Sequence, residues 1–105
     1  MGLHLSLVIA NEVHSSNITH NLGPMARAAG IYEHLWRPEE IGLTHARELI
    51  QPLSLGLQRL KEDREGFEKY SAGNGWGTYA NFVPFVEKYL HACIANPNAE
   101  LRVSR

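Results

Sequence analysis

Two polar segments hold the side chains that are best suited to bind a ligand. They are Asn17-Ile18-Thr19-His20-Asn21 and Asn74-Gly75-Trp76-Gly77-Thr78-Tyr79, and each precedes a stretch predicted to be helical. A helix N-terminus presents free backbone N–H groups and positive potential to an anion. Amide and hydroxyl side chains add hydrogen bonds, and a histidine donates or accepts according to its tautomer. The first segment therefore predicts either an anion site or an ordinary helix cap.

The second segment and one arginine add a flat surface and a positive charge. Trp76 and Tyr79 are able to stack on a planar ligand while Asn74 bonds to its edge, because the flanking glycines allow close backbone approach. The alternative is that Trp76 closes the core and Asn-Gly forms a turn. Arg37, beside Trp36, suits a bidentate contact with phosphate or carboxylate, or an ion pair with a nearby acid.

The predicted ligand site combines both segments with this arginine. If the two helices pack against one small sheet, His20 and Trp76 should line the same cavity. The predicted ligand-binding residues are Asn17, Thr19, His20, Asn21, Arg37, Asn74, Trp76 and Tyr79.

The sequence supports a catalytic or metal site less well than it supports a ligand-binding site. Glu12 and His14 lie two residues apart and His20 follows, which leaves open a small hydrolase, with or without a metal. The chain has no His-Glu-x-x-His or cysteine-rich spacing. Cys93 lies on the apolar face of a predicted helix, where cysteine is usually inert packing. We expect no catalytic residue, cofactor or metal, and whether the protein is an enzyme stays open.

Length and composition describe one folded domain over residues 1–105. The chain is 44% hydrophobic and 20% charged, and its formal charge is -1. Such a balance argues against a nucleic-acid polymer or an acidic membrane as partner. The apolar run 3–10 is too short to span a bilayer and lacks the flanks of a signal peptide. A lone cysteine requires no oxidising compartment, so we expect a cytoplasmic protein.

Hydrophobic periodicity predicts an α+β fold. Strands are expected at both ends, over 3–10 and 99–104, with a polar connection over 11–16. The predicted helices cover 18–29, 31–36, 45–61 with a division at Pro52, 65–70 and 79–95, with Gly30 ending the first and Thr44 and Thr78 as N-caps. The prediction is two terminal antiparallel strands with four or five short helices packed on the sheet. Two strands alone are marginal, which favours a homodimer or higher homo-oligomer.

Four segments together resemble an uncharacterised family of small proteins encoded by bacteriophages and bacteria. The segments are Asn-Ile-Thr-His-Asn-Leu-Gly, Leu-Trp-Arg-Pro-Glu-Glu, Asn-Gly-Trp-Gly-Thr-Tyr and Arg-Val-Ser-Arg, at 17–23, 35–40, 74–79 and 102–105. The likeness extends over nearly the whole chain. It implies a phage or prophage source, and hence the host cytoplasm, without implying a reaction. Gly23-Pro24 departs from the commoner pattern, in which a helix-compatible residue follows the glycine. Because Pro24 cannot donate a hydrogen bond to the His20 carbonyl oxygen, the first helix either begins near Leu22 or tolerates a kink.

Three functions remain open at the level of sequence. The leading hypothesis is a protein that binds a small anionic ligand, such as a phage sponge that sequesters a nucleotide-derived immune signal. In it, Asn17, Thr19 and His20 hold phosphates or ribose. The second is the small hydrolase that uses Glu12, His14 and His20. The third is an interaction module that blocks a host protein with Trp36 and Trp76 as anchors.

Overall fold

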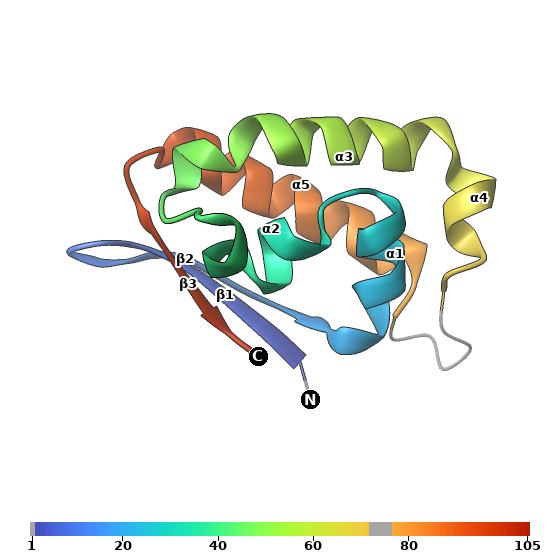
Figure 1. Cartoon of the computed structure of the whole chain (residues 1–105), viewed down its shortest axis with the longest axis horizontal. Coiled ribbons are helices and arrows are strands. Elements are labelled where there is room, and N and C mark those ends of the chain that lie inside the picture. Colours follow the sequence, from blue (N-terminus) through green and yellow to red (C-terminus); the bar gives the residue numbers. More distant parts are fainter. Residues whose placement is uncertain (1, 72–76) are drawn as a thin grey trace.

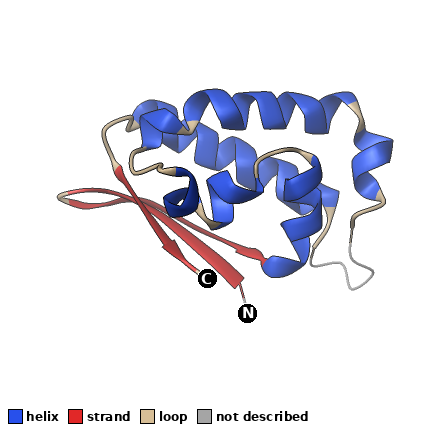
Figure 2. Ribbon diagram, in the orientation of Figure 1, coloured by secondary structure: helices blue, strands red, loops and turns tan. Residues whose placement is uncertain are grey.

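One antiparallel sheet carries the helices on a single face (Figures 1 and 2). The structure, a computed structural model, describes residues 2–71 and 77–105. Strands β1 (Gly2–Ile9), β2 (Asn11–Thr19) and β3 (Glu100–Ser104) are arranged in the order β2-β1-β3. The predicted α+β fold is confirmed, since the strands from the two ends of the chain pair with each other in antiparallel fashion.

The central strand β1 has an apolar side and a polar side. Leu3, Leu5 and Leu7 are fully buried in the core. Because successive side chains of a strand point to opposite faces, His4 and Ser6 lie on the face away from the helices. The sheet therefore has one covered apolar face and one open polar face.

Strand β2 corrects the prediction of a polar connection over 11–16 followed by a helix from residue 18. The whole stretch Asn11–Thr19 is a strand that pairs with β1, from Ile9 opposite Asn11 to Gly2 opposite Thr19. Ala10 makes the reversal with a φ of 59°, a conformation that sequence patterns normally assign to Gly, Asn or Asp. The strand alternates in burial but is polar on both sides, so hydrophobic periodicity does not reveal it.

Helical elements fill the chain between β2 and β3. The short 3-10 turns are η1 (His20–Leu22), η2 (Pro38–Ile41) and η3 (Ala46–Glu48). The α-helices are α1 (Gly23–Ala28), α2 (Tyr32–Trp36), α3 (Ile50–Glu62), α4 (Arg64–Glu68) and α5 (Tyr79–Ala95). Helix α5 packs on β2 and α3 packs on α5, which gives a layered body above the sheet (Figure 1).

The ends of the helices test the predicted caps. Thr78 is confirmed as the N-cap of α5, because its hydroxyl accepts a hydrogen bond from the Asn81 N–H at 3.2 Å. Gly30 follows α1 with a φ of 78°, as expected for a left-handed residue after a helix. Pro24 lies in the first turn of α1, where a proline is well tolerated, so the structure shows the start near Leu22 and not the kink.

Thr44 and Pro52 have other roles than those predicted. The N-cap is His45, ahead of η3, and the Glu48 carboxylate accepts the N–H groups of both Thr44 and His45 at 2.9 Å. Those two hydrogen bonds lower the pKa of Glu48. Pro52 lies inside the first turn of α3, so the division between the two helical pieces falls at Leu49 instead.

Candidate functional site

Two sequence-predicted segments meet at a hydrogen bond between His20 and Trp36. The indole Nε1 of Trp36 donates to His20 Nδ1 at 2.7 Å, and the two ring centroids lie 6.2 Å apart. His20 begins η1 directly after β2, and Trp36 ends α2 with only 2% of its surface exposed. Because Nδ1 is the acceptor, a neutral His20 carries its proton on Nε2.

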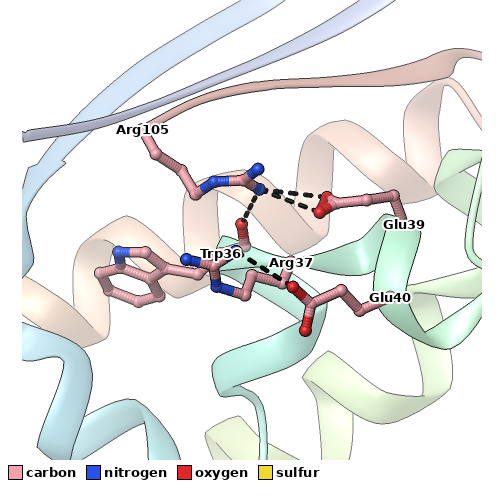
Figure 3. A network of polar contacts seen from close by, with 5 residues as sticks. All are labelled: Trp36, Arg37, Glu39, Glu40 and Arg105. Carbon is pink, nitrogen blue, oxygen red and sulfur yellow. Dashed lines mark hydrogen bonds and ion pairs between the residues drawn. The ribbon is translucent and has the colours of Figure 1, made fainter.

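Arg105 also contacts Trp36, through its side chain. Arg105 Nη1 donates to the Trp36 carbonyl oxygen at 2.7 Å and to the two Glu39 carboxylate oxygens at 3.1 and 3.0 Å (Figure 3). The contact spans 69 residues of sequence. Arg105 was not among the predicted site residues, although it closes the Arg-Val-Ser-Arg segment that contributed to the family resemblance.

A stack of cationic and aromatic groups adjoins this contact. The Arg27 guanidinium carbon lies 4.0 Å from the centroid of the Tyr32 ring, and Tyr32 stacks on Trp36 with centroids 5.2 Å apart and an interplanar angle of 10°. Hydrogen bonds from Arg37 to Tyr32 and to Glu40 raise the pKa of Arg37. We call the group His20, Arg27, Tyr32, Trp36, Arg37 and Arg105 the aromatic–arginine junction.

The junction concentrates groups that recognise anions and flat molecules. Three arginines and a histidine surround two stacked rings, and arginine matches phosphate and carboxylate in a bidentate manner. Two of the arginines pair with acids that are themselves more than half exposed: Arg37 with Glu40 and Arg105 with Glu39, both at 3.0 Å. Exposed pairs of this kind contribute little energy and exchange partners readily.

Residues of the first predicted segment take separate roles. Thr19 is the N-cap of η1, and its hydroxyl accepts the Asn21 N–H at 3.4 Å. Asn17 lies on the open face of the sheet, with its Oδ1 2.6 Å from His4 Nδ1. Asn21 is exposed. Of this segment, His20 is the residue whose side chain bonds to the junction. Asn17 lies on the opposite side of the sheet from the core, because side chains alternate along the extended strand.

Tyr79 belongs to the core and is unavailable for stacking on a ligand. Its side chain is 8% exposed, and its hydroxyl donates to the Leu60 carbonyl oxygen at 2.7 Å. The Tyr79 ring therefore packs in the core. Asn74 and Trp76 lie outside the described residues, as does the prediction that His20 and Trp76 line the same cavity.

The three residues of the predicted hydrolase have different partners. Glu12 accepts a hydrogen bond from Ser6 at 3.2 Å, His14 lies against the Tyr89 ring, and His20 accepts from Trp36. Across residues 2–71 and 77–105, no group of three metal-binding side chains occurs. Cys93 is fully buried, and burial raises the pKa of its thiol to about 12, so it is inert as a nucleophile.

A cavity beside the junction has the volume of a small-ligand site. It is an open hollow of about 470 Å³, a volume within the usual range for such sites. Its lining residues are Glu39, Leu43, Thr44, His45, Glu100 and Leu101. Glu39 pairs with Arg105, which also donates to the Trp36 carbonyl oxygen, so Glu39 connects the cavity to the junction.

Comparison with family models, with curated proteins and with solved structures found no match. In the part of the chain that the structure describes, no helix is long and apolar enough to cross a membrane.

Proposed function

We propose that this protein binds a small, anionic, planar ligand at the aromatic–arginine junction. The observation that carries the proposal is the stack of Arg27 on Tyr32 and of Tyr32 on Trp36, bordered by Arg37. An aromatic ring that already holds a guanidinium on its face offers a flat surface and a mobile cation together.

The junction suggests how such a ligand would be held. Trp36 is buried, so the accessible ring is that of the half-buried Tyr32. A planar base takes the place of the Arg27 guanidinium on Tyr32, and exposed Arg27 then turns to a phosphate of the same ligand. Arg37, hydrogen-bonded to Tyr32 and paired with exposed Glu40, supplies a second charge. His20 keeps its Nε2–H as a donor while Trp36 fixes its ring.

Binding without turnover fits the groups at the junction. The carboxylates that adjoin it, Glu39 and Glu40, are each paired with an arginine of the junction. Sequestration requires affinity and no catalytic group. Together with the resemblance to phage-encoded proteins, this supports a sponge in the host cytoplasm that withholds a nucleotide-derived immune signal.

Calorimetric titration tests the proposal. The purified protein is titrated with a panel of cyclic dinucleotides and cyclic ADP-ribose isomers, and we expect at least one to bind with a dissociation constant of about 1 μM or below. Tyr32→Leu should weaken that binding about tenfold or more, because stacking of a base on an aromatic side chain is lost. The ligand should be recovered unchanged after denaturation.

The matched control is Tyr70→Leu. Tyr70 is 40% exposed and follows α4, a helix that contains none of the junction residues. This variant should bind as the wild type does. Absence of binding to every member of the panel, or equal losses in Tyr32→Leu and Tyr70→Leu, would contradict the proposal.

A further inference from the structure

The open face of the sheet gathers serine, histidine and asparagine side chains from two neighbouring strands. In the register of β1 and β2, His4 lies opposite Asn17 and Ser6 lies opposite Ser15. Directly opposite residues in antiparallel strands project to the same face, close enough for their side chains to interact. Since Leu3, Leu5 and Leu7 occupy the covered face, these four polar residues share the open one.

Hydrogen bonds orient the His4 ring. Its Nδ1 lies 2.6 Å from Asn17 Oδ1, which can only accept, so Nδ1 carries the ring proton. The lone pair is then on Nε2, which lies 3.1 Å from both Ser6 Oγ and Ser15 Oγ. His4 is therefore held in the tautomer that accepts a proton from a serine hydroxyl.

The two serines are not equivalent. Ser6 Oγ donates its single proton to Glu12 Oε2 at 3.2 Å, and Ser6 is only 5% exposed. Ser15 Oγ has His4 Nε2 as its partner and lies on an exposed residue of the edge strand. Ser15 is thus the hydroxyl that is both accessible and hydrogen-bonded to the base.

An arginine lies on the same open face as these serine, histidine and asparagine side chains. Arg102 of β3 lies opposite Ser6 in the register of β1 and β3, so it projects from the same face. Its guanidinium is 65% exposed and is paired with Glu100 at 3.3 Å. Ser6 of β1 separates Arg102 from Ser15, so Arg102 adds positive potential to the open face from two strands away.

We propose that Ser15, His4 and Asn17 act as nucleophile, base and orienting residue in the hydrolysis of small activated esters. Ser15 Oγ attacks the ester carbonyl carbon while its proton passes to His4 Nε2. The carbon–oxygen bond to the leaving group then breaks, and the leaving alkoxide takes that proton. Water attacks the acyl-serine, gives its proton to His4, and releases the acid as Ser15 Oγ recovers the proton. The inference is independent of ligand binding at the aromatic–arginine junction.

An active-site probe tests the assignment. The protein is incubated with a fluorophosphonate, whose phosphorus Ser15 Oγ attacks with loss of fluoride and the serine proton, and the adduct is located by peptide mass spectrometry. Labelling is expected on Ser15. It should be lost in Ser15→Ala and slowed at least about a hundredfold in His4→Gln, because the general base is removed. The turnover of p-nitrophenyl acetate should fall in parallel.

Ser16→Ala is the matched control. Ser16 is the neighbouring serine, and it lies opposite Leu5 on the covered face, so this variant should label like the wild type. Circular dichroism melting checks that each variant is folded. No adduct on the wild type, an adduct at another residue, or Ser15 labelling that is unchanged in His4→Gln would overturn the inference.

Discussion

Histidines at three positions show how neighbours decide the role of one side-chain type. His4 is oriented by Asn17 on the open face, and His20 accepts a hydrogen bond from Trp36. His14 faces the helices and lies 5.9 Å from the Tyr89 ring, centroid to centroid. Its buried Nε2 has no hydrogen-bond partner within the described part of the chain. The sequence, which contains six histidines, does not predict these three roles. Each role depends on a partner residue that is distant along the chain or on a neighbouring strand.

His14 makes stability depend on pH. Burial lowers its pKa from the ordinary value of 6.5, and the nearby Glu12 carboxylate only partly opposes this. The unfolded chain therefore binds a proton at a higher pH than the folded chain does. Stability should be constant above that range, fall as the pH drops below about 6.5, and level off beneath the folded pKa. Burial also lowers the pKa of His34, which adds to the same slope.

Urea denaturation at a series of pH values measures this effect. His14→Phe keeps a ring against Tyr89 and cannot titrate. Its unfolding free energy should therefore fall less than that of the wild type between about pH 7.5 and 5.5, roughly one unit either side of the ordinary histidine pKa. The residual slope belongs to His34. Comparison at about pH 8, where both histidines are neutral in either state, corrects for any change in packing. Identical slopes in the two proteins would contradict this assignment.

At the scale of elements, helix α3 depends on a glycine to approach Ile31. Gly56 is buried in the middle of this helix, and a β-carbon built on it would lie 2.5 Å from Ile31 Cγ2. An alanine raises helix propensity by about 1 kcal/mol relative to glycine. Overpacking a core costs about 1 to 3 kcal/mol. The close contact should outweigh the gain in propensity.

Gly56→Ala is therefore expected to lower the unfolding free energy by about 1 kcal/mol. Chemical denaturation measures it, with Ser54→Ala as the control on the exposed side of the same helix. That control should change stability by only a few tenths of a kcal/mol. If Gly56→Ala is as stable as the wild type or more so, Ile31 moves away at no cost and the glycine has no packing role.

At the scale of the whole molecule, the sheet ends in a strand whose outer edge pairs with no other strand among the described residues. Strand β2 lies at the edge of the order β2-β1-β3, and its hairpin with β1 projects beyond the helices (Figure 1). It contains neither lysine nor proline, the residues that commonly prevent an edge strand from pairing with another chain. Val13 on this strand is 45% exposed. These features favour the homodimer that the small sheet suggests, with β2 paired to a second copy.

Light scattering coupled to size-exclusion chromatography tests this assembly. The wild type is expected at twice the chain mass of 11.8 kDa. Val13→Lys should elute as a monomer, because a lysine on an edge strand opposes pairing. Leu55→Lys is the matched control, since Leu55 is also 45% exposed but lies on α3. A monomeric wild type, or a dimer that persists in Val13→Lys, would contradict pairing through β2.

Local sequence patterns were sufficient to predict several helices and strands. The apolar period and the Thr78 cap predict α5 with the bounds that the structure shows, and alternation predicts β1 and β3. Gly30 marks the end of α1. Capping, periodicity and left-handed glycines act within a few residues of sequence, so the amino acids themselves carry these features.

The α+β class, the terminal strands and the principal helices thus follow from local patterns of residues. Long-range packing makes 11–19 a strand, buries Tyr79 and brings Arg105 to Trp36. The same holds for the register that sets Ser15 and Asn17 around His4. Strand pairing and long-range contacts depend on which distant segments pack together, whereas a local pattern reflects only what neighbouring residues favour.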